Sequence, residues 1–233
     1  AYRSPAAFAD AAREAERLKA VYGIRADIQD SAALARAEPA LRTTLAGAVH
    51  WLDAWSVQDP GELVEAYARA FTRMGGELRE GDAMTLQAHE GGWRVRASHG
   101  WLHAQHAVVA LGPWSDALIR LHGYRFPLFV KRGYHQHYAG GDRLHLALLD
   151  AERGYVLAPM KRGMRLTTGA EFALLDAPAT PVQLPRAQAM ALELMDLQDP
   201  QDHPPWLGAR PCTADMLPVM GPAPRHKGLW FNF

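Results

Sequence analysis

Apolar residues near the N-terminus recur at the spacing of one face of an α-helix, as Phe8, Ala15 and Leu18 illustrate. Ser4 with Pro5 suits the start of this helix and Gly23 its end. The same period and similar caps predict further helices over residues 31–37, from 60 to the glycines at 75–76, over 115–122 and over 185–196.

After the glycines at 75–76 the period changes from about 3.6 to two, which is typical of strands. Short strands with glycine-containing hairpin turns are predicted over residues 77–79, 84–89, 93–98 and 101–103. The run 107–111 is apolar throughout and ends at Gly112, so we expect a strand buried on both faces in a parallel sheet.

The second half of the chain is again rich in strands. They are predicted over 131–138, 143–149, 154–159, 164–169, 206–211, 218–221 and 229–233, with a proline-rich loop at 199–205. Helices between antiparallel strands, with one parallel-type strand, predict an α+β (α/β) fold with a mixed, largely antiparallel sheet and flanking helices.

Composition narrows the class of protein. The 233 residues carry 25 Lys and Arg against 25 Asp and Glu, so no basic surface for nucleic acid is expected. A single cysteine, Cys212, excludes an internal disulfide and favours a reducing compartment. The longest apolar runs are far shorter than the roughly 20 residues of a membrane span. The chain starts without Met and stops inside an apolar, strand-like run, which indicates a piece of a longer protein.

Several motif-based chemistries are absent. The sequence has no G-x-G-x-x-G, no P-loop and no G-x-S-x-G. Cys212 has no neighbouring histidine, which favours a small apolar filler over a nucleophile. His135 and His137 share one face of a strand, and histidines also gather at 99–106, but no carboxylate stands at a ligand spacing. We therefore expect solvated or hydrogen-bonded histidines and no metal.

Two residues are candidates for binding a carboxylate. Arg210 ends an apolar strand, where a guanidinium needs a planar anionic partner. That partner is either a structural acid such as Asp215 or a ligand carboxylate, and the residues alone do not separate the two. Tyr155 lies on a predicted strand, where a phenol is either a packing residue or a second carboxylate contact.

Five segments, in order along the chain, resemble the FAD-dependent D-amino-acid oxidoreductases, the family of D-amino-acid dehydrogenase, D-amino-acid oxidase, glycine oxidase and sarcosine oxidase. The dehydrogenase branch looks most similar. The segment 208–221 resembles "GxRPxTxDxxPxxG" and 107–115 resembles "VVxAxGxWS". The other three are the helix start at 58–63, the turn into a strand at 127–134, and the strand and turn at 164–171.

The resemblance also implies which parts of the family pattern are missing. Members begin with a Gly-rich FAD-binding unit and follow their last matching strand with a Gly/His-rich loop, neither of which is in this chain. It implies substrate-domain residues at 1–57 (helical) and 123–205 (sheet and helix). It implies parts of a Rossmann-like FAD domain at 58–122 and 206–233. We expect the isolated chain to bind FAD weakly or not at all and to be inactive.

The resemblance implies FAD as cofactor and assigns roles to residues. Arg210 matches the arginine that binds the substrate carboxylate, and Tyr155 falls on a pocket strand. Met84, Ala110 and Gly112 match positions whose backbone approaches FAD. The implied reaction is hydride transfer from Cα of a D-amino acid to flavin N5, without a side-chain base, followed by hydrolysis to a 2-oxo acid and ammonia.

Partners and alternatives follow from the same resemblance. The implied electron acceptor is a quinone or O2, and the implied location is the cytoplasm, with peripheral contact at the cytoplasmic face of a membrane left open. Two other functions also remain open. One is a secondary-amine oxidase of the glycine or sarcosine type, and the other is a cofactor-free carboxylate-binding or structural module.

Overall fold

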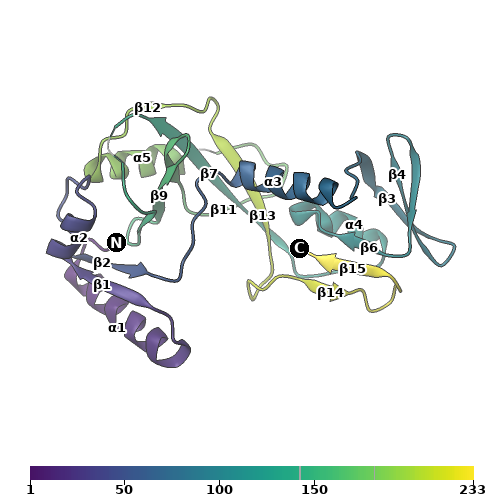
Figure 1. The fold of residues 1–233 in the computed structure, drawn as a ribbon, viewed down its shortest axis with the longest axis horizontal. Coiled ribbons are helices and arrows are strands. Elements are labelled where there is room, and N and C mark those ends of the chain that lie inside the picture. The colour runs from purple at the N-terminus through teal and green to yellow at the C-terminus, as the bar shows by residue number, and fades with distance from the viewer. Residues whose placement is uncertain (142, 181) are drawn as a thin grey trace. The chain divides into compact units, whose positions relative to one another are not determined.

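A computed structural model describes residues 1–141, 143–180 and 182–233 of the chain (Figure 1). The chain divides into two compact units, each assembled from three segments. The first unit comprises Ala1–Leu63, Gly133–Ala170 and Pro178–Leu207, and the second comprises Val64–Arg132, Glu171–Ala177 and Gly208–Phe233. The segment boundaries at 63/64 and 207/208 lie near the sequence-based boundaries at 58 and 206. The boundary at 132/133 lies further from 123, and Glu171–Ala177, within the sequence-based range 123–205, falls in the second unit. The assignment of the two units to substrate and FAD stays a prediction.

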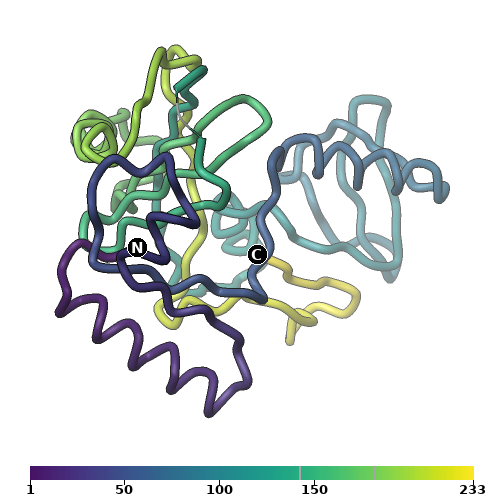
Figure 2. The backbone as a smooth tube through the Cα atoms, turned by 60° about the vertical axis from the view of Figure 1, so that its left-hand side comes forward, coloured from purple at the N-terminus to yellow at the C-terminus, as the bar shows by residue number. Residues whose placement is uncertain are grey.

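The first unit begins with α1 (Pro5–Tyr22), which forms as predicted. The Ser4 side chain accepts a hydrogen bond from the backbone N–H of Ala7, and Gly23 closes the helix at φ 68°. The helix packs against the antiparallel hairpin of β1 (Ala26–Asp30) and β2 (Gly47–Trp51), beside it in Figure 2. These two strands were not predicted, so the description of residues 1–57 as helical is incomplete.

Along the chain, α2 (Ser31–Ala37) lies between β1 and β2, and it has the predicted bounds. Asp30 accepts from the backbone N–H of Ala33, so the predicted cap is confirmed. The next helix is α3 (Pro60–Arg73). Asp59 caps its start, and the Oδ1 of Asp59 accepts from the N–H of Glu62 at 3.0 Å. The Glu62 carboxylate does not close a capping box, because it pairs with Lys161 Nζ at 2.9 Å.

The largest sheet has the order β11-β7-β10-β9-β8, and β12 and β13 also pair with β7. Every pair with a determined register in it is antiparallel. One face of β7 carries Tyr134 and Tyr138 into a core that α5 completes from the same side with Leu184, Ala191 and Leu194. The bounds are β7 (Phe129–Ala139), β8 (Leu148–Asp150), β9 (Tyr155–Met160), β10 (Gly163–Thr167), β11 (Glu171–Phe172), α5 (Gln183–Leu194), β12 (Asp199–Pro200) and β13 (Trp206–Cys212).

The second unit contains two smaller sheets. The meander β3 (Gly81–His89), β4 (Gly92–Ala97) and β5 (Gly100–Ala104) is antiparallel. The other sheet has the order β14-β15-β6, in which β6 and β15 are parallel. A core including Trp93, Ile119 and Phe231 fills this unit. The remaining bounds are β6 (Ala107–Val109), the 3-10 turn η1 (Gly112–Trp114), α4 (Ser115–Leu121), β14 (Met220–Pro222) and β15 (Leu229–Asn232).

The α+β (α/β) class with largely antiparallel sheets is thus confirmed, but several elements differ from the prediction. Residues 77–79 form no strand, and of 143–149 only the last two residues join β8. The parallel pairing of 107–111 is confirmed for Ala107–Val109, but burial on both faces is wrong. Val109 is 2% exposed while Val108 is 61% exposed, because alternate side chains of a strand point to opposite faces.

Candidate functional site

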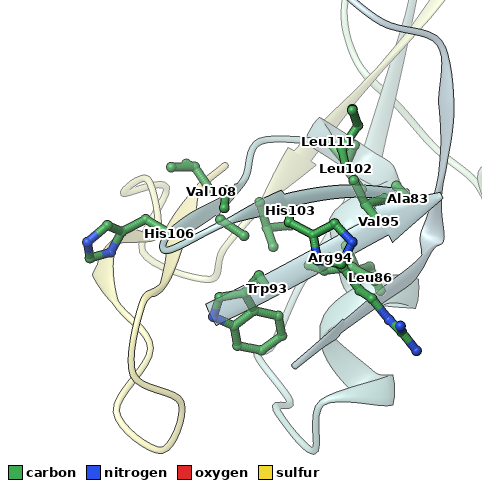
Figure 3. Close-up of a pocket in the computed structure, with 14 residues that line it drawn as sticks. Ala83, Leu86, Trp93, Arg94, Val95, Leu102, His103, His106, Val108 and Leu111 are labelled. Atoms are coloured by element: carbon green, nitrogen blue, oxygen red, sulfur yellow. The ribbon is translucent and has the colours of Figure 1, made fainter. Parts of the chain in front are cut away.

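A cavity of about 350 Å³ lies in the second unit, between the β3–β5 meander and β6 (Figure 3). Leu86, Trp93 and Val109 are among its apolar lining residues. Of its polar lining residues, Arg94 stacks on the Trp101 ring at 4.5 Å, and His106 accepts from the Trp230 indole N–H at 3.2 Å. In Figure 3 both heads point away from the other labelled residues. His103 is a third polar lining residue, but most of the lining side chains are apolar, so the cavity suits an apolar group better than a phosphate.

The predicted cofactor residues Ala110 and Gly112 follow β6 directly. Because β6 and β15 are parallel, these residues lie at the carboxyl ends of parallel strands, where α/β sheets bind their ligands. Ala110 is exposed. Gly112 has φ +55°, and a Cβ added to it would meet no heavy atom within 4 Å. The backbone here is therefore open to a ligand.

Met84, the third predicted cofactor residue, lies on β3 and is 45% exposed. Its backbone N–H donates to Asp82 Oδ1 at 2.9 Å, within the stretch where the β3–β4 register shifts. Its neighbour Ala83 lines the cavity. The structure therefore places Met84 beside the cavity, with its N–H already bonded.

Arg210 is exposed on β13, and no hydrogen bond or ion pair of its side chain occurs among the described residues. The acid considered as its structural partner has other contacts. Asp215 Oδ1 accepts from the backbone N–H of Leu217 at 3.1 Å, and this bond is the main cause that lowers the pKa of Asp215. The Arg210 guanidinium is therefore exposed to solvent and is not paired with this acid.

Tyr155 is placed differently from the expectation of a pocket residue. It is 1% exposed, and its hydroxyl donates to the backbone carbonyl of Met190 at 3.2 Å. Arg3, which pairs with Asp150 at 2.8 Å, also reaches the phenol oxygen at 3.5 Å. Burial raises the pKa of Tyr155, so the phenol stays neutral. In this structure Tyr155 contacts core residues, and its role toward substrate stays a prediction.

The chain also has residues for which sequence reasoning found no partner. His135 and His137 on β7 meet Asp202, which follows β12, and one ligand atom from each lies within 4.8 Å of the others. The sequence alone shows no carboxylate near these two histidines, because Asp202 lies 65 residues after His137. The histidines at 99–106 form no such group within 1–141, 143–180 and 182–233.

Cys212 is half-buried and borders a second, smaller cavity of about 190 Å³ in the second unit. Its neighbours there include Leu128, Pro211 and Phe233. No base adjoins the thiol among these lining residues, which suits an apolar filler and not a nucleophile.

The profile of the family described as "FAD dependent oxidoreductase" (DAO) matches residues 1–233. D-amino acid dehydrogenase of Cereibacter sphaeroides is 30% identical, over 99% of this chain and 54% of its own length. Glycine oxidase of Pseudomonas putida is 27% identical, over 97% of this chain and 60% of its own length. The crystal structure of glycine oxidase from Geobacillus kaustophilus matches with a TM-score of 0.83 and 20% identity, over 99% of this chain and 63% of that one.

The chain thus spans little more than half the length of the curated relatives it matches. None of the helices in the described part of the chain has the length and apolar character needed to cross a bilayer.

Proposed function

Because the chain belongs to the FAD-dependent oxidoreductase family, we propose that the whole protein is an FAD-dependent enzyme that oxidises D-amino acids to 2-oxo acids and ammonia. The family profile covers the full chain, and a D-amino acid dehydrogenase is among the relatives with 30% identity. The proposal rests on one structural observation about Arg210. Its guanidinium is exposed and has no side-chain partner among the described residues.

Arg210 would bind the substrate carboxylate. A guanidinium offers parallel N–H donors that match the two oxygens of a carboxylate, so one residue fixes both position and orientation. Its place on a strand restricts its motion more than a loop would. Holding the carboxylate in this way turns the Cα–H bond toward one direction, which is the main contribution of the protein to such a reaction.

The residues present fit the cofactor in part. The open backbone at Gly112 and the exposed Ala110 lie at the carboxyl ends of parallel strands and would lie against the dinucleotide. Met84, beside the cavity, would meet its adenine end. When bound, FAD supplies the acceptor for the hydride that leaves Cα.

The remaining chemistry concerns the substrate alone. Loss of the Cα hydride with its electron pair and of one N–H proton leaves an imine, and water then adds and releases ammonia. We assign no residue of this chain as a catalytic base. The electrons pass on to a quinone or to O2, and a quinone acceptor would require peripheral contact with a membrane.

A second candidate is oxidation of a secondary amine or glycine. The glycine oxidase of Pseudomonas putida and the TM-score of 0.83 to that of Geobacillus kaustophilus favour it. The role of Arg210 is the same in both, since both substrate classes carry a carboxylate.

The test uses the full-length protein. It is purified, its flavin is identified by absorbance, and it is offered D-amino acids, L-amino acids, glycine and sarcosine. We expect 2-oxo acid and ammonia in equal amounts from D-amino acids. Peroxide release and reduction of a quinone analogue, measured side by side, identify the acceptor. Preference for glycine or sarcosine would select the second candidate. A colourless protein that binds carboxylates tightly by calorimetry would replace both with a cofactor-free binding module.

A further inference from the structure

One face of the largest sheet, within the first unit, carries two imidazoles and a carboxylate in close proximity. His135 and His137 are two residues apart on β7, so both side chains leave the face opposite to Tyr134 and Tyr138. Asp202 approaches them from the segment between β12 and β13. One nitrogen of each histidine and one carboxylate oxygen lie within 4.8 Å of one another.

The Asp202 carboxylate is held in place before any ligand binds. Its Oδ2 accepts from the backbone N–H of His137 at 2.9 Å and lies 2.8 Å from His137 Nδ1. Its Oδ1 pairs with Arg162 at 2.7 Å. The backbone carbonyl of Asp202 accepts from the Gln136 amide at 2.9 Å. These bonds fix the segment against β7, so little ordering is left for a ligand to impose.

The two imidazoles are positioned in different ways. His137 is 6% exposed, and its Nδ1 lies 2.8 Å from Asp202 Oδ2, which holds the ring against the carboxylate. His135 lies flat against the Trp206 indole, with ring centroids 4.5 Å apart and planes at 16°. Within the described parts of the chain the His135 side chain makes no hydrogen bond, so its ring nitrogens are available.

We propose that His135, His137 and Asp202 bind a divalent transition-metal ion, with Zn²⁺ as the best match. Two imidazoles and one carboxylate favour Zn²⁺ and its neighbours over Mg²⁺ and Ca²⁺, which prefer all-oxygen sites. Three protein ligands leave a fourth tetrahedral position for water. The ion would link β7 to the segment that leads into β13, so it would stabilise the first unit.

Two positively charged arginines lie near the proposed ligands and disfavour a bound cation. Arg162 occupies one oxygen of Asp202, and Arg165 faces His137 in the β7–β10 pairing. Both cations raise the cost of placing a second positive charge nearby. Removing Arg162 should therefore tighten zinc binding, whereas removing a ligand should weaken it.

The experiment measures zinc affinity of the full-length protein after chelator treatment, by competition with a chromophoric chelator. We expect one zinc per chain, and a Kd at least about 10-fold higher in His135→Ala, His137→Ala and Asp202→Asn. Arg162→Met should lower the Kd. His89→Ala and His103→Ala are the matched controls, because these rings also lie 4.9 Å apart but belong to no group of three ligands in the described residues.

The variants stay informative if one of them fails to fold. His135→Ala removes no hydrogen bond of the described structure but loses the stacking on Trp206, so its own unfolding temperature in chelator is the baseline for the effect of zinc. Zinc should raise the unfolding temperature of the wild type and not that of His135→Ala. Absence of saturable zinc binding, or a zinc affinity equal in His135→Ala and the wild type, would overturn the proposal.

Discussion

Arg132 and Glu171 form an ion pair in which the guanidinium Nε and Nη2 lie 2.9 and 2.8 Å from Glu171 Oε2. Their side chains are 2% and 14% exposed. Both residues belong to segments through which the sequence resembles its family, 127–134 and 164–171. The β7–β11 pairing brings them opposite each other, so two motifs 39 residues apart meet in one contact.

Loss of this pair should be costly. Glu171→Ala leaves a buried guanidinium without its carboxylate, and we expect the free energy of unfolding to fall by about 3 kcal/mol. Urea denaturation measures it. Glu14→Ala is the control, because its pair with Arg17 is about half exposed on both sides and should give no measurable change. Equal effects of the two substitutions would contradict the structural role of Glu171.

Arg210→Ala should lower kcat/KM for an amino-acid substrate by about 30- to 1000-fold, equivalent to about 2–4 kcal/mol of lost carboxylate binding. Arg210→Lys should recover only part of the lost kcat/KM, since an ammonium cannot donate two parallel hydrogen bonds. Steady-state kinetics of the flavin-loaded protein measures both. Arg186→Ala, which removes another exposed arginine, should leave kcat/KM unchanged. An Arg210→Ala enzyme with wild-type kcat/KM would exclude this residue from substrate binding.

Tyr155→Phe distinguishes a core residue from a substrate contact. The hydroxyl bonds to the Met190 carbonyl inside the core, so its removal should lower the free energy of unfolding by about 1 kcal/mol. We expect KM to stay within about threefold of the wild type, less than the roughly 10-fold or larger rise that losing a hydrogen bond to a charged carboxylate would cause. A large rise in KM at unchanged stability would instead support the sequence-based role in the substrate pocket.

Gly163 permits the tight turn between β9 and β10. Its φ is +122°, and an added Cβ would collide with the backbone carbonyl of Tyr138. Gly163→Ala should therefore cost more than about 2 kcal/mol of unfolding free energy. Gly154 has φ +72° but open space around it, so Gly154→Ala should cost only about 1 kcal/mol. Chemical denaturation of both variants measures these losses of unfolding free energy. A larger loss in Gly154→Ala than in Gly163→Ala would contradict the prediction.

Because Tyr138 is buried, we expect the free energy of unfolding to depend on pH in the alkaline range. Burial raises the pKa of Tyr138 from 10.0 to about 12, so the unfolded chain releases this proton at lower pH than the folded chain does. Stability is complete below about pH 10 and falls as the pH rises toward 12. Between about pH 9 and about pH 11 the wild type should lose about 1 kcal/mol more than Tyr138→Phe.

The control for this pH dependence is Tyr67→Phe, since Tyr67 is 70% exposed on α3. Its loss of stability over the same pH interval should equal that of the wild type. If Tyr138→Phe and the wild type lost stability in parallel, Tyr138 would not be the group responsible.

The helices could be predicted because their signals are local. Ser4, Asp30 and Asp59 each cap the helix that follows them, and a cap needs only neighbouring backbone N–H groups. Arg210 became a candidate because it ends an apolar strand and matches a family motif. The structure places it in solvent, so no buried charge requires an anion there, and its role in binding a carboxylate stays a prediction.

Only the tertiary structure showed the contacts between residues that lie far apart in the sequence. The β1–β2 pair escaped prediction because its strands are short and are held together by pairing across α2. Val108 is exposed, and Tyr155 is buried among Arg3, Asp150 and Met190, although both read as strand residues. Asp202 joins His135 and His137 only through the fold. By itself the sequence determined the capped starts of α1, α2 and α3, the strand-rich class and the family resemblance, since these depend on local spacing. Which side chains meet depends on long-range packing, which no local pattern encodes.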